Sequence, residues 1–286
     1  PDRPAGRGKK LKASPVKEFA VEHNIPVYQP EKIKNDQEVL QFLKTCEADV
    51  FVTVAFGQIL SKDILDIPRL GTINLHASLL PKYRGANPIQ WAIINGDRST
   101  GVTTMLTAEG VDTGDMLLKQ EMPISLDTNA LVLTKMVSGL GSRVLVDTLL
   151  ALKEGSIKPI PQDHKKATKA PKLKKDFGKI NWSNNTLKIH NIIRGTQPWP
   201  GAYTYSKDQI LKIHSSYVSC ICDDVEDRTP GTIKQIDNKS IQVYTGDGFI
   251  DIMEVQPPNK PSMKAIDWAR GARVEEGEMF SFDICT

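Results

Sequence analysis

The chain has 286 residues, 40% of them hydrophobic and 25% charged, a composition that excludes a wholly disordered protein and a collagen-like one. At the usual domain size, this length predicts two domains, each able to bury a core without disulfides or a metal. The net charge of +3 and the isoelectric point near 8.6 are only mildly basic, so binding to a polyanion depends on local clusters of charge.

From about residue 14 to residue 155, helical and extended patterns alternate, which is typical of an α/β domain with a mostly parallel sheet. Ser14 followed by Pro15 predicts the N-cap and first turn of a helix. Asn35, with Glu38 three residues later, resembles a capping box and predicts the start of a second helix.

The next predicted elements are three strands and a long helix. A valine-rich run at 49–55 predicts a strand that is buried on both faces. Residues 72–75 and 102–106 predict two further strands. Thr128 opens a long pattern of helical apolar spacing, and Gly155 closes it.

After Gly155 the composition changes, because residues 164–176 are rich in lysine and show little apolar periodicity. From Thr229 onward, short alternating stretches such as 240–244 and 249–255 predict a small antiparallel barrel or sandwich. The expected segments are an α/β domain, a basic linker and a small β domain, at 1–155, 156–178 and 179–286.

The cysteines give no sign of a metal site or of a disulfide framework. Their spacings lack the paired pattern of zinc ligands, so we expect no structural metal and a reducing compartment. No run approaches the length of a membrane span, and the N-terminus has no signal-peptide pattern. We expect a cytoplasmic protein, with an organelle matrix as the alternative. The four cysteines are Cys46, Cys220, Cys222 and Cys285.

Three polar side chains stand out in the middle of the first domain. Asn74 and His76 are two residues apart on a predicted strand, so both side chains point to one face. They precede the loop at 78–85, which places them at the carboxyl edge of the sheet, where open α/β folds bind ligands. Asp112 lies in a turn between two glycines that can bring its carboxylate to the same edge.

An amide, an imidazole and a carboxylate in one pocket suit acyl transfer to an amine. Asn74 would donate a hydrogen bond to the developing oxyanion, His76 would donate as well or accept the proton of the amine, and Asp112 would orient His76 and relay a proton. The alternative is that all three are polar strand-end and turn residues satisfied by the backbone. Spacing alone leaves these interpretations about equally supported.

A resemblance to a known family favours the catalytic interpretation of these residues. With Asn-Leu-His-Ala-Ser-Leu-Leu-Pro-Lys-Tyr-Arg-Gly at 74–85 and Asp-Thr-Gly at 112–114, the chain closely resembles the 10-formyltetrahydrofolate-dependent formyltransferases. Two more runs resemble the methionyl-tRNA formyltransferases among them: Pro-Asp-Arg-Pro-Ala-Gly-Arg-Gly-Lys-Lys-Leu at 1–11 and Gln-Pro-Trp-Pro-Gly-Ala at 197–202. The similarity covers essentially the whole chain.

The resemblance implies a Rossmann-like formyltransferase domain, a linker and an OB-like barrel that binds tRNA. It also implies that Asn74, His76 and Asp112 are the catalytic set. Members of the family begin with a further strand and helix, so the first domain is expected to be truncated at its N-terminus. The residues that the resemblance places against the folate are Ser78, Leu79, Leu80 and Pro81.

Two basic clusters are candidates for contact with nucleic acid. The first is a glycine-containing loop near the N-terminus, which the resemblance places in the acceptor stem of tRNA; its tRNA-binding residues are Arg3, Arg7, Lys9 and Lys10. The second is the linker, where a cationic track and a merely solvated segment remain equal alternatives; its lysines are Lys165, Lys166, Lys169, Lys172, Lys174 and Lys175.

The resulting hypothesis is an enzyme that transfers formyl from 10-formyltetrahydrofolate to the amino group of methionine on initiator tRNA, for translation initiation. We expect it to act as a monomer, with the folate as cosubstrate and without metal or membrane. One alternative is a formyltransferase that acts on a small amine, because the three polar residues alone do not select tRNA. The other is a fragment that binds folate or RNA without catalysis.

Overall fold

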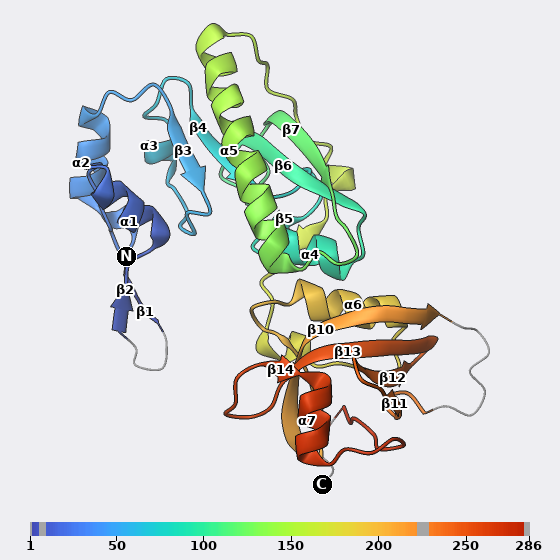
Figure 1. Cartoon of the computed structure of the whole chain (residues 1–286). Coiled ribbons are helices and arrows are strands. Elements are labelled where there is room, and N and C mark those ends of the chain that lie inside the picture. The colour runs from blue at the N-terminus through green and yellow to red at the C-terminus, as the bar shows by residue number, and fades with distance from the viewer. Residues whose placement is uncertain (1, 6–9, 222–228, 283–286) are drawn as a thin grey trace.

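The computed structural model describes residues 2–5, 10–221 and 229–282. Within them the chain forms a four-stranded sheet with helices in its N-terminal half and a six-stranded sheet in its C-terminal half. Figure 1 shows the long helix α5 (Ala130–Glu154) lying along the first sheet, and α6 (Thr186–Gly195) lying between the two halves. The chain is thus an α/β unit followed by a mostly antiparallel β unit.

The N-terminal elements confirm one predicted cap and correct another. The Ser14 hydroxyl accepts from the Lys17 amide, so the first helix begins where the sequence indicates. The second helix is capped by Asp36, whose carboxylate accepts from the Val39 amide at 3.0 Å, and not by Asn35, which lies in a preceding 3-10 turn. These elements are β1 (Arg3–Ala5), β2 (Lys10–Lys12), α1 (Pro15–Glu22), η1 (Ile33–Asn35) and α2 (Gln37–Thr45).

The first sheet has the order β3-β4-β6-β7. Only β3 and β4 are parallel, whereas β4–β6 and β6–β7 are antiparallel, so the predicted mostly parallel sheet is wrong for the described residues. For β6 and β7 the reason is the short link at 107–115, because a parallel pair needs a crossover of a dozen or more residues. The strands and the helix between β3 and β4 are β3 (Phe51–Val54), α3 (Lys62–Leu65), β4 (Thr72–His76), β6 (Ser99–Leu106) and β7 (Met116–Pro123).

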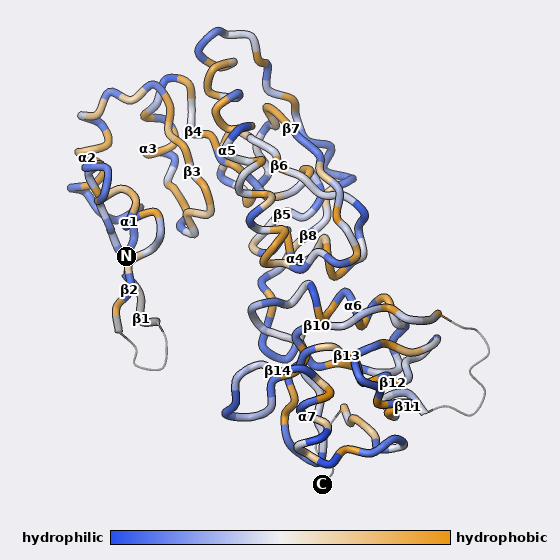
Figure 2. Tube along the Cα trace, viewed as in Figure 1, coloured by the Kyte–Doolittle hydropathy of each residue, from blue (hydrophilic) through white to orange (hydrophobic). Residues whose placement is uncertain are grey.

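The strand β3 is not buried on both faces, which corrects a second expectation. Its residues alternate between partly buried and exposed, and Val52 and Val54 are 41% and 54% exposed. In the described part of the chain, β3 pairs with β4 alone and forms the edge of the sheet. Figure 2 shows that this strand is apolar, and its edge position is what leaves these apolar side chains partly exposed.

Two helices pack against the first sheet. One is α4 (Pro88–Ile94), which sequence patterns did not indicate, and the other is α5. The N-cap of α5 is Asn129, whose side chain accepts from the Val132 amide, rather than Thr128. Gly155 ends the helix with a φ of 66°, as its position predicts. The core between sheet and helices includes Ala92, Ile93, Val102, Leu133 and Val137.

The segment that leaves α5 is attached to the first half by backbone pairing. Strand β5 (Arg84–Gly85) runs parallel to β8 (Lys169–Ala170). Gly85 has a φ of 122°, and a Cβ on it would lie 2.7 Å from the Ala170 carbonyl oxygen, so this pairing requires glycine. We call residues 162–173 the strap. The short helices η2 (His164–Lys166) and η3 (Lys175–Gly178) flank β8.

The second half forms an antiparallel sheet with the order β11-β12-β13-β10-β9 and with β14 beside β13. The strands predicted at 240–244 and 249–255 are confirmed as β12 and β13. Isolated bridges join Met279 to Thr232 and Ser281 to Tyr205. The elements are β9 (Ala202–Ser206), β10 (Gln209–Ile221), β11 (Ile233–Ile236), β12 (Ile241–Thr245), β13 (Gly248–Gln256), β14 (Met263–Lys264) and α7 (Ala265–Ala272).

Helix α6 packs on β10 and on α4, and so connects the cores of the two halves. Its inner face adds Ile189, Ile192 and Ile193 to the core of the second half. None of the helices in the described ranges has both the length and the apolar character of a membrane span.

Candidate active site

His76 is the last residue of β4, and its side chain is 7% exposed. Its Nε2 lies 2.9 Å from the Tyr83 carbonyl oxygen. Because a carbonyl only accepts, Nε2 must carry the proton of this hydrogen bond. In the neutral ring, Nδ1 then has a free lone pair, and it lies 3.6 Å from Oδ1 of Asp112. The ring is thus held in one tautomer with its basic nitrogen beside a carboxylate.

Asp112 lies in the link between β6 and β7, with a left-handed φ of 52°. Its Oδ2 accepts from the Gly85 amide at 2.8 Å, while Oδ1 faces His76. Its backbone carbonyl accepts from Nε2 of Gln162 at 3.0 Å. The structure therefore brings Asp112 and His76 together, as the sequence predicts, and the Gly85 amide binds the carboxylate oxygen that does not face His76.

Asn74 lies across from Thr53 in the register of β3 and β4. The Thr53 hydroxyl donates to Oδ1 of Asn74 at 2.9 Å, which turns the amide so that its Nδ2 hydrogens remain available. Among the described residues, no hydrogen bond joins Asn74 to His76 or Asp112. The three side chains come from one sheet edge and its adjacent link, and within the described ranges the polar pairing among them is that of His76 with Asp112.

The loop predicted to contact folate has two kinds of residue. Ser78 and Leu80 are buried, at 0% and 1% exposure. The Ser78 hydroxyl donates to the Lys82 carbonyl, and Leu80 packs with Met105 and Met116. Leu79 and Pro81 are half-buried. Of these four side chains, the ones with exposed surface for a ligand are therefore Leu79 and Pro81.

Three residues that support the site were missed by sequence reasoning: Thr53, Tyr83 and Gln162. The Tyr83 hydroxyl donates to Asp97 at 2.8 Å and accepts from Asn95 at 3.0 Å, and burial raises the pKa of this phenol to about 12. Thr53 and Gln162 act at sequence separations of 21 and 50 residues. No local pattern could have signalled these contacts.

The predicted tRNA-contacting residues are only partly placed. Arg7 and Lys9 lie outside the described residues. The backbones of Arg3 and Lys10 lie on the paired strands β1 and β2, opposite Lys12 and Ala5 respectively. The linker lysines Lys165, Lys166, Lys169, Lys172, Lys174 and Lys175 are all exposed.

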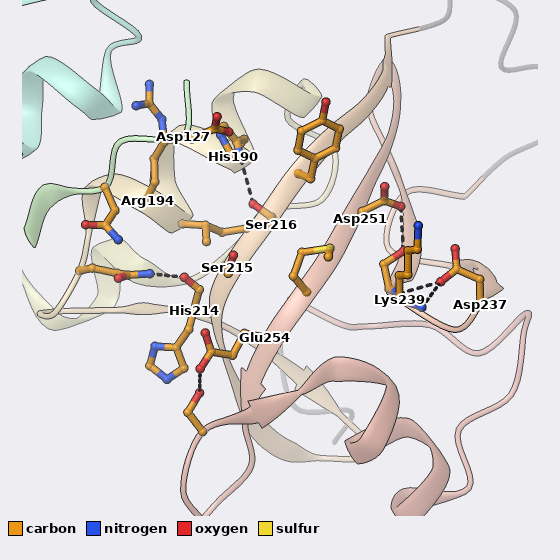
Figure 3. A pocket seen from close by; sticks show the side chains of 17 residues that line it. Asp127, His190, Arg194, His214, Ser215, Ser216, Asp237, Lys239, Asp251 and Glu254 are labelled. Carbon is orange, nitrogen blue, oxygen red and sulfur yellow. Dashed lines mark hydrogen bonds between the residues drawn. The ribbon is translucent and has the colours of Figure 1, made fainter. Parts of the chain in front are cut away.

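A cavity of about 700 Å³ lies elsewhere, between α6 and the strands β10 and β13 (Figure 3). Its lining carries both charges, with Lys239 near Asp237 and Asp251 on one side and Arg194 near Asp127 on the other. The polar groups are largely paired with one another: Ser240 donates to Asp251, and Ser262 to Glu254. This cavity contains none of the predicted site residues.

At the edge of this cavity, side chains of α6 bind backbone carbonyls at residues 125–128 of the first half. Nε2 of His190 lies 2.9 Å from the Leu126 carbonyl oxygen, and its Nδ1 lies 3.0 Å from the Ser216 hydroxyl. Arg194 donates from Nη1 to the carbonyls of Ser125 and Thr128 at 3.1 and 2.9 Å. Burial lowers the pKa of both His190 and Arg194. We call these contacts the joint.

Comparison with known proteins gives matches over most of the chain. The family described as "Formyl transferase" matches residues 1–149, and "Formyl transferase, C-terminal domain" matches residues 172–273. The methionyl-tRNA formyltransferase of Clostridium acetobutylicum is 50% identical over 277 residues, which cover 97% of this chain and 88% of that protein. The methionyl-tRNA formyltransferase of Ruminiclostridium cellulolyticum is 47% identical over 280 residues, with coverage of 97% and 88%.

Solved structures share the fold at low identity. HypX from Aquifex aeolicus, in complex with tetrahydrofolic acid, is 19% identical with a TM-score of 0.59 and is matched over 81% of this chain and 40% of its own. WlaRD, a sugar 3N-formyltransferase crystallised in the presence of dTDP and 5-N-formyl-THF, is 21% identical with a TM-score of 0.64, over 88% and 83%. At these identities the likeness concerns the arrangement of the chain alone.

Proposed function

The chain belongs to the methionyl-tRNA formyltransferase family, and from that premise we propose that it transfers a formyl group from 10-formyltetrahydrofolate to the amino group of methionine on initiator methionyl-tRNA. The observation that carries the proposal is the contact between Nδ1 of His76 and the Asp112 carboxylate, at the carboxyl edge of the sheet. It is supported by the close relatives, which bear this name over nearly the whole length of the chain.

In this proposal, His76 accepts the proton that the amine loses. Attack of the methionine nitrogen on the formyl carbon leaves a proton on nitrogen, and Nδ1 is the ring atom with a free lone pair. The imidazolium that forms lies 3.6 Å from Asp112, whose negative charge stabilises it. The same ring returns the proton to the folate nitrogen as the carbon–nitrogen bond of the donor breaks.

Asn74 stabilises the oxygen that becomes negative. Because Thr53 occupies its Oδ1, the amide presents its Nδ2 hydrogens as donors in a fixed orientation. A prearranged donor of this kind is worth on the order of 10²- to 10³-fold in rate when it is directed at a developing oxyanion. The backbone at 78–81 would contact the folate, together with the side chains of Leu79 and Pro81. Ser78 and Leu80 would hold that loop from inside.

For the nucleic acid, the proposal divides the chain as the sequence suggests, with a catalytic domain at 1–155, a basic linker at 156–178 and a tRNA-binding domain at 179–286. The exposed lysines of the linker and the loop that contains Arg3, Arg7, Lys9 and Lys10 would contact phosphates. The last domain would be OB-like, its sheet extended by the bridges of Met279 and Ser281. The protein would act in the cytoplasm as a monomer.

The test is transfer of labelled formyl from 10-formyltetrahydrofolate to methionine-charged initiator tRNA, with the protein as the cell makes it. We expect transfer in the wild type and a loss on the order of 10²- to 10³-fold in Asn74→Leu, which removes the donor at similar volume. Transfer to a small amine but not to the charged tRNA would keep the chemistry and overturn the substrate. Binding of tRNA without any transfer would overturn the enzyme.

A further inference from the structure

Gln162, in the strap, uses every hydrogen-bonding position of its side-chain amide. It is 5% exposed. Its Oε1 accepts from Nε and Nη2 of Arg84, at 3.1 and 2.6 Å. Its Nε2 donates to the carbonyl oxygens of Asp112 and Gly114, at 3.0 and 2.7 Å. Two acceptor and two donor positions are thus filled by groups from two different loops.

The donor side of this amide holds the turn that carries Asp112. Asp112 has a φ of 52°, and left-handed backbone at a residue other than glycine persists where surrounding contacts hold it. Gln162 binds the carbonyls on both sides of Thr113. Gly114 is equally constrained, because a Cβ on it would lie 1.7 Å from the Leu106 carbonyl oxygen. The turn is therefore closely packed, and the two hydrogen bonds from Gln162 stabilise it.

The acceptor side holds the segment that binds the carboxylate. Arg84 precedes Gly85, whose amide donates to Oδ2 of Asp112 at 2.8 Å. Two other residues of the strap also bind Arg84: its guanidinium donates to Nδ1 of His164, and its backbone amide donates to the Thr168 carbonyl. Gln162 thus joins the two parts whose separation sets where the Asp112 carboxylate lies relative to His76.

We infer that Gln162 is a positioning residue, which keeps the Asp112 carboxylate beside His76 by linking the turn at 112–114 to the Arg84–Gly85 segment. The inference rests on the proposed function of His76 and Asp112. Among the described residues, no hydrogen bond joins Gln162 to His76, so the effect proposed for Gln162 passes through Asp112. It also makes the start of the basic strap a structural part of the catalytic half.

The substitution Gln162→Glu keeps the hydrogen bonds that the side chain accepts and removes those that it donates. The carboxylate still accepts from Arg84, but it places a negative oxygen against the carbonyls of Asp112 and Gly114 in place of their donor. We expect kcat for formyl transfer to fall on the order of 10- to 100-fold, the scale of a displacement of about 1 Å at a reacting group. KM for methionyl-tRNA should change by less than about threefold, because substrate contacts are untouched.

A matched control is Gln256→Glu in the second half. The Gln256 amide is also bound on both sides, since its Oε1 lies 3.2 Å from Nε2 of His214 and its Nε2 donates to the Lys260 carbonyl at 2.9 Å, but it is half-buried and has one partner on each side where Gln162 has two. Gln256 lies at the end of β13, in the second half of the chain. We expect wild-type kcat for this variant, so a loss specific to Gln162→Glu reports on the site.

The decisive measurement is a double-mutant cycle of kcat with Asp112→Asn. If Gln162 acts through Asp112, Gln162→Glu causes little further loss once Asp112 is replaced. Losses that multiply, or a Gln162→Glu variant as active as the control, overturn the inference. An Asp112→Asn variant with near wild-type kcat overturns instead the proposed role of Asp112. Should Gln162→Glu not fold, Gln162→Asn, which keeps a neutral amide one methylene shorter, enters the same cycle with the same expected non-additivity.

Discussion

In both halves of the molecule, a histidine lies with its Nε2 2.9 Å from a backbone carbonyl oxygen, which is that of Tyr83 for His76 and that of Leu126 for His190. Burial does not separate them, because the two residues are 6% and 5% exposed. The difference lies at Nδ1. In His190 it accepts from the Ser216 hydroxyl, whereas in His76 it faces the Asp112 carboxylate.

The comparison separates a histidine whose two ring nitrogens are both hydrogen-bonded from one whose free nitrogen faces a carboxylate, the arrangement that the proposed proton transfer by His76 requires. A neutral ring that donates from one nitrogen and accepts on the other is fully satisfied, and protonation would break one of these bonds. A ring that donates from one nitrogen and has a free lone pair on the other can accept a proton without losing a hydrogen bond. Arg194 belongs with His190, since its bonds to backbone carbonyls and Asn191 serve the joint.

The largest expected effect comes from breaking the catalytic side of this comparison. His76→Ala should lower kcat for formyl transfer by a factor on the order of 10² to 10⁴, the usual contribution of a positioned general base. His190→Ala, an equally buried imidazole, should leave kcat of the folded protein within about threefold. Single-turnover transfer at saturating folate and charged tRNA measures both. Equal losses in the two variants would remove the distinction at Nδ1.

The next effect concerns the joint. Arg194→Met should lower the free energy of unfolding by about 2–4 kcal/mol, because hydrogen bonds to two backbone carbonyls lose a charged, buried donor. Urea denaturation measures the change, and Arg270→Met, at an exposed position of α7, should stay within about 0.5 kcal/mol of wild type. A loss of transfer in folded Arg194→Met protein at high substrate would place this residue on the catalytic side.

A smaller effect tests which atom of Tyr83 serves His76. Tyr83→Phe keeps the backbone carbonyl and removes the hydroxyl bound by Asp97 and Asn95, so we expect a loss of about 1 kcal/mol in stability and a kcat within about threefold of wild type. In alkaline ultraviolet titration of the wild type, this phenol should ionise only at a pH of about 12. A much lower kcat in Tyr83→Phe would show that the phenol, and not the carbonyl alone, supports the ring.

The smallest effect is the pH dependence of stability at the joint. Burial lowers the pKa of His190 below its ordinary value of 6.5, so the unfolded chain binds more protons than the folded chain between pH 6.5 and the lower pKa of the folded state. The stabilisation by the neutral ring is therefore present above pH 6.5 and is lost as the pH falls through the folded pKa. The midpoint of urea unfolding should decrease between about pH 7.5 and about pH 5.5, and this decrease should be smaller in His190→Gln than in wild type. An identical fall in both proteins would contradict this.

Local patterns in the sequence were sufficient for several parts of this protein. The cap at Ser14, the end of α5 at Gly155 and the strands β12 and β13 depend on residues near in the chain, so composition and periodicity predict them. Strand alternation, a glycine-flanked turn and family motifs predict Asn74, His76 and Asp112 as one catalytic set, and the structure brings His76 and Asp112 into contact.

Only the tertiary structure decided which partners bind and orient the predicted site residues. The open edge at β3 and the supporting contacts of Thr53 and Gln162 depend on how distant segments meet. Asp112 and Gln162 are 50 residues apart, and Arg84 and Gln162 are 78 apart. Such contacts form only once strands and strap have a common arrangement, because no propensity within a few residues of Gln162 records which carbonyls its amide will reach.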